Sequence, residues 1–165
     1  MDVIGVVCEY NPFHRGHEYH LMMSRRAADG ADTPVVCVMS GDFVQRGEPA
    51  MFSKFARAEA ACLCGADLVV ELPLPWTLSS AEGFARGAVG LLAALGATRL
   101  SFGSETGETE PLETIAEALL DPDMTDEIKA ELSRDASLSF ASARQRALEK
   151  RLGELSEQIR FPNNI

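Results

Sequence analysis

Short apolar runs alternate with longer amphipathic stretches through the first 103 residues. The first two runs are rich in β-branched side chains and predict buried strands at residues 3–8 and 33–39, and two further runs predict strands at residues 67–72 and 99–102. Helical periodicity and capping residues between them predict helices at about residues 16–28, 53–64 and 79–96. Strands that alternate with helices at this spacing favour a parallel sheet with right-handed crossovers. We therefore expect an α/β, doubly wound core over residues 1–103.

The remaining stretch, residues 104–165, has a different pattern. Thr109 before Glu110 and Pro111 predicts a helix start, Thr125 is expected to cap a second short helix, and a third should begin at Phe140 and run to about residue 155. The pattern predicts C-terminal helices over residues 104–165. We expect this mainly helical extension and the α/β core to form one domain over residues 1–165. Residues 104–135 hold eleven acidic against two basic side chains, so most of the net charge of −10 is local to this stretch.

The composition places the chain among soluble proteins. Hydrophobic residues make up 46% and charged residues 24%, and no apolar run approaches the length of about 18 that a membrane span needs. The first residues also lack the features of a signal peptide, so we expect a cytoplasmic protein with no membrane contact. The four cysteines show no metal-ligand spacing, which predicts buried, reduced thiols and no metal site at Cys8, Cys37, Cys62 and Cys64.

All three histidines lie just after the first predicted strand, at positions 14, 17 and 20. In parallel α/β sheets this is where ligands meet the N–H groups of a helix N-terminus. His14 and His17 are three apart and should share one face of the first helical turn, while Gly16 lets a base or phosphate approach the backbone. The pattern favours nucleotide chemistry, with imidazolium groups stabilising the charge that develops on phosphates. Helix-capping or metal-binding histidines are the alternative interpretation.

The H-R-G-H stretch resembles the H-x-G-H signature of the nucleotidylyltransferase superfamily. Longer blocks, VCEYNPFHRGHEYH, MSGDFVQRGEPAMFSKFARAEA, LSFGSETG and PNN, resemble the bacterial tRNA(Met) cytidine acetate ligase family almost end to end. The resemblance implies a Rossmann-like, HUP-type fold that activates acetate with ATP, accompanied by Mg²⁺, to acetyl-adenylate. It also implies transfer of the acetyl group to the wobble cytidine of elongator tRNA(Met), which forms N4-acetylcytidine.

The same resemblance assigns roles to individual residues. It implies that His14 and His17 face the phosphates and are catalytic. Arg46 and Lys54 lie in a loop region that also contains Gln45 and Arg57, and their charges are expected to bind a substrate phosphate, with a solvated surface as the alternative. Asp42 is expected to contact substrate. Position 42 is Asp where the family usually has Asn, which adds charge to this region. The implied ATP-binding residues are Val7, Cys8, Glu9, Tyr10, Asn11, Pro12, Phe13, His14, Arg15, Gly16, His17, Glu18, Tyr19, His20, Gly103 and Asn163.

Two other functions fit the short signature. H-x-G-H alone is also typical of a generic nucleotidylyltransferase that joins a small phosphorylated metabolite to AMP. A non-catalytic ATP- or RNA-binding module is the third hypothesis. The superfamily's second, arginine-containing signature is expected beyond Ile165, so we expect this chain to be the N-terminal part of a longer enzyme.

Overall fold

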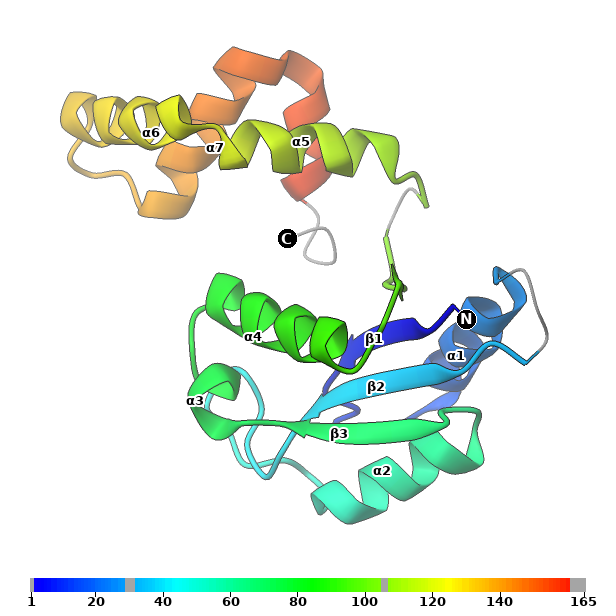
Figure 1. Cartoon of the computed structure of the whole chain (residues 1–165). Helices are drawn as coiled ribbons and strands as arrows, with labels where there is room; N and C mark the ends of the chain where they lie inside the picture. The colour runs from blue at the N-terminus through cyan, green and yellow to red at the C-terminus, as the bar shows by residue number, and fades with distance from the viewer. Residues whose placement is uncertain (1, 29–31, 105–106, 161–165) are drawn as a thin grey trace. The chain divides into compact units, whose positions relative to one another are not determined.

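The computed structural model describes residues 2–28, 32–104 and 107–160, with the side chains of residues 158–160 left out. The chain divides between Phe102 and Gly103 into two compact units (Figure 1), one residue from the boundary expected from the sequence. The first unit is a four-stranded parallel sheet with helices on both faces, which confirms the predicted fold class. None of the helices in the described part of the chain combines the length and the apolar character needed to cross a membrane.

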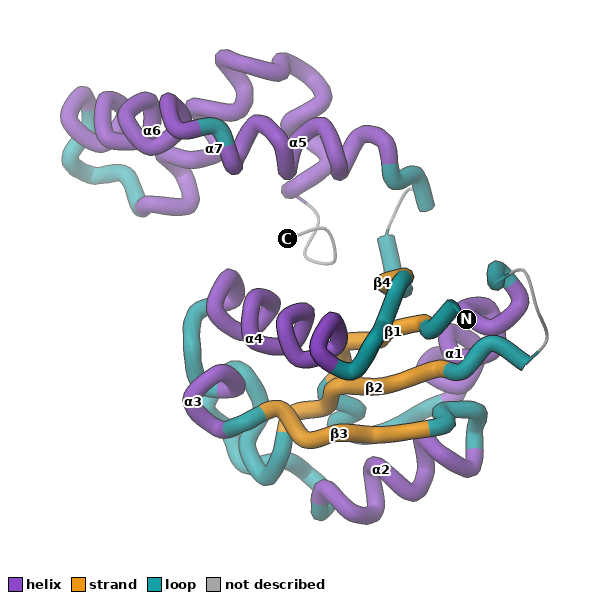
Figure 2. The backbone as a smooth tube through the Cα atoms, viewed as in Figure 1, coloured by secondary structure: helices purple, strands orange, loops and turns teal. Residues whose placement is uncertain are grey.

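The strand order is β3-β2-β1-β4, with β1 (Ile4–Cys8) and β2 (Val35–Ser40) in the centre. Ile4 lies opposite Val35 and Cys8 opposite Met39, so both central strands end at the same edge. The outer strands are β3 (Leu68–Leu72) and the two-residue β4 (Arg99–Leu100), visible in Figure 2. β4 is shorter than predicted because only Ile4 and Gly5 of β1 pair with it.

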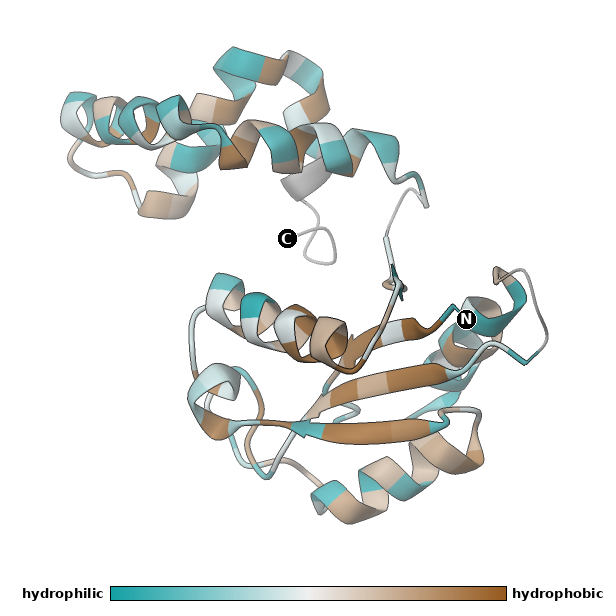
Figure 3. Ribbon diagram, in the orientation of Figure 1, coloured by the Kyte–Doolittle hydropathy of each residue, from teal (hydrophilic) through white to brown (hydrophobic). Residues whose placement is uncertain are grey.

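Alternate residues of the central strands bury two apolar faces, and the strands form the hydrophobic centre seen in Figure 3. One face packs against α1 (Arg15–Arg26) and α2 (Lys54–Leu63), and Leu21 and Ala61 are buried there. The other face packs against α4 (Ala81–Ala94) through Ala88 and Leu92. Ser80 rather than Ser79 caps α4, because its hydroxyl accepts the N–H of Gly83.

Gly5 marks the closest approach of α4 to the sheet. A Cβ at this position would lie 2.8 Å from Cδ1 of Leu92. We expect Gly5→Ala to lower the free energy of unfolding by about 1–3 kcal/mol, the usual cost of overpacking a tight core. Urea denaturation would measure it. Gly90→Ala is a matched control, because Gly90 lies exposed inside α4 with nothing within 4 Å of its added Cβ, and it should stabilise by about 0.5–1 kcal/mol. Equal changes of the same sign in the free energy of unfolding of both variants would contradict the tight packing of Gly5 against Leu92.

The second unit is helical, as predicted, with its own core of apolar side chains that includes Ile115, Met124 and Leu148. It contains α5 (Glu110–Leu120), α6 (Pro122–Arg134), α7 (Phe140–Leu152) and the 3-10 helix η1 (Gly153–Arg160). The predicted cap at Thr125 is wrong. Asp121 caps α6 instead, because its carboxylate accepts the N–H of Asp123 while Pro122 occupies the first helical position.

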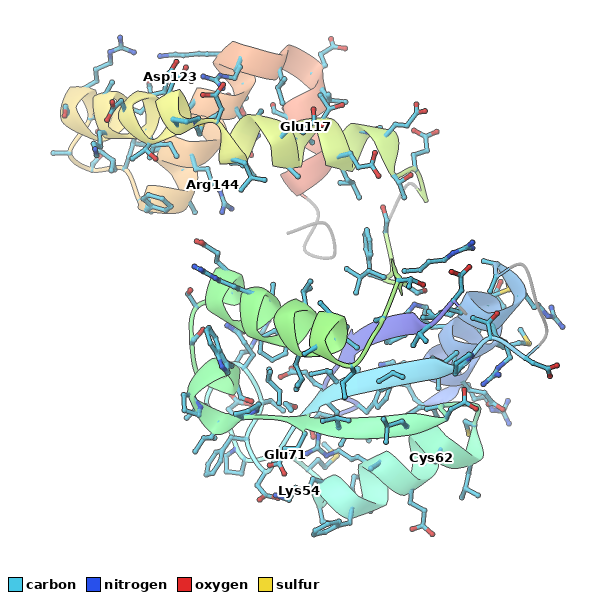
Figure 4. The ribbon with its side chains drawn as sticks, in the orientation of Figure 1. Lys54, Cys62, Glu71, Glu117, Asp123 and Arg144 are labelled. Carbon is cyan, nitrogen blue, oxygen red and sulfur yellow. The ribbon has the colours of Figure 1, made fainter. Side chains whose placement is uncertain are left out.

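Two further expectations differ from the structure. A short helix, α3 (Leu74–Thr77), follows β3 where none was predicted; Pro73 precedes it and Pro75 lies in its first turn. The expectation of four buried thiols holds for Cys37 and is wrong for Cys62, which lies exposed on α2 (Figure 4), while Cys8 and Cys64 are only half-buried. All four cysteines are free.

Candidate nucleotide-binding site

The turn between β1 and α1 is built around a buried tyrosine. Tyr10 is only 2% exposed and has a φ of +48°, a left-handed conformation uncommon for a non-glycine residue. Its ring lies 4.9 Å from the ring of Phe13 and 4.9 Å from that of His17, and its hydroxyl contacts the Sγ of Cys37. Packing in the apolar core therefore holds this turn in an otherwise unfavourable backbone conformation.

His14 and His17 lie together, as predicted, but they also cap the helix. His14 is the N-cap of α1, where its Nδ1 accepts the N–H of Gly16 at 3.1 Å. The Nδ1 of His17 accepts the N–H of His14 at 3.3 Å, so the two rings form a reciprocal capping box. The rings are stacked, with centroids 3.7 Å apart and planes 21° apart. The capping alternative and the nucleotide-binding hypothesis therefore describe the same two side chains.

The capping bonds decide where the ring protons lie. An Nδ1 that accepts a hydrogen bond carries no proton, so each neutral ring keeps its proton on Nε2. No described residue engages either Nε2 in a hydrogen bond. Two N–H donors are thus available beside the N-terminus of a 12-residue helix, whose own N–H groups attract anions.

Ring packing sets the ionisation of His17 in the free protein. Burial against Tyr10 and Phe13, and then the neighbouring His14 and His20, lower the pKa of His17 to about 4. At neutral pH His17 is therefore an uncharged imidazole that donates from Nε2, and not an imidazolium. The sequence could not show this, because the desolvation comes from ring packing.

This lowered pKa predicts how stability depends on pH. An unfolded histidine has a pKa of about 6.5, so between pH 6.5 and 4 the unfolded chain takes up a proton that folded His17 does not. The free energy of unfolding should consequently fall as pH drops through this window, and His20, whose pKa is also lowered by burial, adds to the effect. Urea denaturation at pH 7, 6 and 5 measures it, and His17→Gln should flatten the profile. An NMR titration of the His17 ring with a midpoint near 6.5 would contradict the prediction.

His20 links the same helix to the chain beyond β4. Its Nε2 lies 3.0 Å from the hydroxyl of Ser101, which in turn lies 2.6 Å from the hydroxyl of Ser24 on α1. His20 is thus a structural neighbour of the capping pair, one helical turn further along.

Carboxylates and one lysine lie together at the ends of β2 and β3. Nζ of Lys54 is 2.8 Å from Oε2 of Glu71 and 3.5 Å from Oδ2 of Asp42, and Figure 4 shows the lysine and Glu71 pointing toward each other. Hydrogen bonding to Glu71 raises the pKa of Lys54, followed by the charge of Asp42. The structure therefore brings Asp42 and Lys54 together, with the lysine charge already paired. Arg46, the third expected substrate-binding residue, is exposed on the loop after β2.

The family match covers the whole chain. Residues 1–165 match the model of the HIGH Nucleotidyl Transferase family. The chain belongs to this family. The H-R-G-H stretch that resembles the H-x-G-H signature contains the capping pair at the start of α1.

Relatives and solved structures agree with the family assignment. The chain is 48% identical over 151 residues to the tRNA(Met) cytidine acetate ligase of Acetivibrio thermocellus, which covers 91% of this chain and 36% of that protein. It is 46% identical to the ligase of the same name from Caldanaerobacter subterraneus, over all of this chain and 41% of that protein. The crystal structure of Thermotoga maritima TmcAL bound with alpha-thio ATP matches with a TM-score of 0.91 and 40% identity, covering 99% of this chain and 41% of that one. The chain thus spans about two fifths of the length of these relatives.

The other residues expected to contact ATP are placed differently. Arg15, Glu18 and Tyr19 are exposed on the first turns of α1, and Val7 and Cys8 are partly buried at the end of β1. Gly103 lies three residues beyond the end of β4, with open space around an added Cβ, so its expected contact with ATP stays a prediction. Asn163 lies outside the described residues.

The described residues contain no group of three side chains that could hold a metal ion. Mg²⁺ commonly binds through one or two carboxylates and the phosphates of its substrate. Asp42, Glu71 and Glu9 are carboxylates at this edge; the first two are paired with Lys54, and Oε1 of Glu9 accepts the N–H of Gln45. The residues present therefore do not fit a preformed Mg²⁺ site.

Sequence reasoning missed the importance of one residue. Arg57 was grouped with surrounding basic side chains, but it is only 2% exposed and connects several loops at this edge. Its position on α2 facing buried Ala61, one turn along, was the available signal.

Proposed function

We propose that this chain is the ATP-binding, adenylate-forming part of a tRNA(Met) cytidine acetate ligase. The observation that carries the proposal is the stacked His14–His17 pair, which presents two Nε2–H donors beside the N-terminus of α1. Such an arrangement suits the phosphates of a nucleotide, since it supplies positioned donors and a helix dipole without requiring a charged ring. The similarity to ligases of this name, and to TmcAL bound with alpha-thio ATP, supports the choice of reaction.

In the proposed reaction, a carboxylate oxygen of acetate attacks the α-phosphorus of ATP and pyrophosphate leaves with the electron pair of the broken P–O bond. Negative charge develops on the phosphate oxygens, where the Nε2–H groups of His14 and His17 donate hydrogen bonds. Because the pKa of His17 is low in the free protein, a bound triphosphate would raise it and favour proton uptake. In the second step the N4 amine of the wobble cytidine attacks the acetyl carbonyl and AMP leaves.

The decisive assay is acetate-dependent exchange between ATP and pyrophosphate, followed by N4-acetylcytidine formation in elongator tRNA(Met), with the complete protein encoded by the gene. Exchange that requires acetate supports the proposal. Exchange that requires a phosphorylated metabolite instead would favour a generic nucleotidylyltransferase. ATP binding with no exchange under any substrate would favour a non-catalytic binding module.

A further inference from the structure

Arg57 is a charged side chain buried almost completely at the carboxyl edge of the sheet. Its Nε donates to the carbonyl of Phe52 at 3.1 Å, one terminal nitrogen donates to the carbonyl of Glu9 at 2.5 Å, and the other donates to the carbonyl of Gly41. Among the described residues no carboxylate forms an ion pair with it. Burying a guanidinium is costly unless its N–H groups are satisfied, and here backbone carbonyls satisfy them.

The three carbonyls belong to three different segments around the candidate site. Glu9 immediately precedes Tyr10 and the turn that leads to His14, Gly41 immediately follows β2, and Phe52 precedes Ser53, the N-cap of α2. One rigid, planar guanidinium therefore fixes the exits of β1 and β2 and the entry of α2 relative to one another.

Two other hydrogen bonds join the same segments. The N–H of Gln45 donates to Oε1 of Glu9 at 2.6 Å, and the N–H of Met51 donates to Oδ1 of Asn11 at 2.6 Å. The loop after β2 is thus hydrogen-bonded to the side chains of Glu9 and Asn11, which lie on either side of Tyr10. The position of the histidine pair depends on the backbone between Glu9 and Asn11, because α1 begins only four residues after Asn11.

Arg25 provides an internal comparison at the opposite edge of the same sheet. It donates to the carbonyl of Thr33 at 3.1 Å and to that of Gly65 at 2.9 Å, and pairs with Asp67 at 2.6 Å. These residues precede β2 and β3, so Arg25 joins loops at the amino ends of the strands. Both arginines donate hydrogen bonds to backbone carbonyls of separate segments. Only the carbonyls bound by Arg57 belong to the segment that leads to the histidines and to the loop joined to it.

We propose that Arg57 is a positioning residue for the nucleotide, which acts through the backbone of Glu9 and Gly41 to hold the His14–His17 turn in its binding geometry. The inference rests on the proposed ATP binding at this turn and does not depend on which acceptor the adenylate chemistry uses. Loss of the guanidinium should leave the sheet folded and loosen the turn.

The test compares Arg57→Gln with Arg25→Gln in the complete protein, by calorimetric titration with ATP and by thermal unfolding. Both variants should lower the melting temperature, because each leaves backbone carbonyls unpaired. Arg57→Gln should weaken ATP binding by roughly 10-fold or more and slow acetate-dependent pyrophosphate exchange by up to about 100-fold, the cost of misplaced binding groups. Arg25→Gln should leave ATP affinity within about 2-fold of wild type, because Arg25 lies at the amino ends of the strands and the histidine turn lies at the carboxyl end of β1.

A second variant and a spectroscopic readout keep the test decisive. Arg57→Lys keeps the charge but not the forked geometry, so it should fold and recover only part of the affinity. The three histidine rings give separate NMR signals, and those of His14 and His17 should shift in the Arg57 variants and stay in place in Arg25→Gln. Unchanged ATP affinity in both Arg57 variants, or equal losses in the Arg25 variant, would overturn the inference. Wild-type protein that binds ATP without acetate-dependent exchange would instead refute the proposed function and leave the binding comparison intact.

Discussion

Replacing His17 with alanine is expected to slow acetate-dependent adenylate formation by about 10² to 10³-fold, the usual loss when one preorganised donor to a developing charge is removed. The structure gives this residue two roles that the variant would remove together. Its Nε2–H is available to a phosphate, and its Nδ1 accepts the N–H of His14 at the helix cap. Loss of the cap should also lower the free energy of unfolding, by about 0.5–2 kcal/mol. The rate of ATP–pyrophosphate exchange and urea denaturation measure the two effects.

His17→Gln separates the two roles. Glutamine at the third helical position can still accept the N–H of the N-cap residue, so this variant should keep most of the stability while losing most of the rate. Glu59→Gln, on the exposed side of α2, serves as a surface control that should change neither quantity. A rate for His17→Gln equal to that of wild type would remove the imidazole from the chemistry and leave it a capping role only.

Replacing Tyr10 with alanine is expected to lower the free energy of unfolding by about 3–5 kcal/mol, as for other buried aromatic side chains. Tyr10 is 2% exposed and packs in the same core cluster as Ile4, Val6 and Leu21. Its ring also covers one side of His17, so its loss would admit water to that imidazole. We therefore expect the pKa of His17 to move up from about 4 toward its ordinary value, together with the loss of stability.

Tyr10→Phe is the matched control for this prediction. It removes only the contact between the hydroxyl and the Sγ of Cys37, which is a weak hydrogen bond at 3.5 Å, and keeps the ring against Phe13 and His17. Stability and the His17 titration should both stay close to wild type. If Tyr10→Ala unfolds at room temperature, Tyr10→Leu at low temperature allows the NMR titration. A His17 midpoint that stays near 4 in that variant would show that ring burial by Tyr10 is not the cause of the low pKa.

Local sequence patterns predicted most of the fold because its strands and caps depend on local chemistry. The runs that form β1 and β2 are mostly apolar and β-branched, so a buried strand was the simplest interpretation, whereas β3 at the side of the sheet is only partly buried. Ser53 and Ser80 cap their helices through side-chain oxygens that a sequence displays directly. The failures occurred where two local signals competed. Thr125 looked like a cap, but Asp121 followed by Pro122 starts the helix four residues earlier.

The candidate site was predicted only in part. The spacing of His14 and His17 was sufficient to place them on one helical turn, because i and i+3 residues are neighbours in any helix start. The expected phosphate-binding role of Lys54 depends on contacts that spacing does not show, since Glu71, from another strand, pairs with it at 2.8 Å. Arg57 and Arg46 were grouped together as basic residues near the end of β2, yet Arg57 is buried at the junction of three segments and Arg46 is exposed.

The sequence by itself determined the strand–helix alternation, the helical second unit, the family and the pair of histidines at the first helix. Periodicity, capping and a four-residue signature act over a few neighbouring residues, and so they can be seen in one dimension. Tertiary structure alone decided the ionisation of His17, the pairing of Lys54 and the carbonyl contacts of Arg57. Each of these depends on groups brought from elsewhere in the chain, such as Gly41, 16 residues from Arg57, and on how much water the packing excludes.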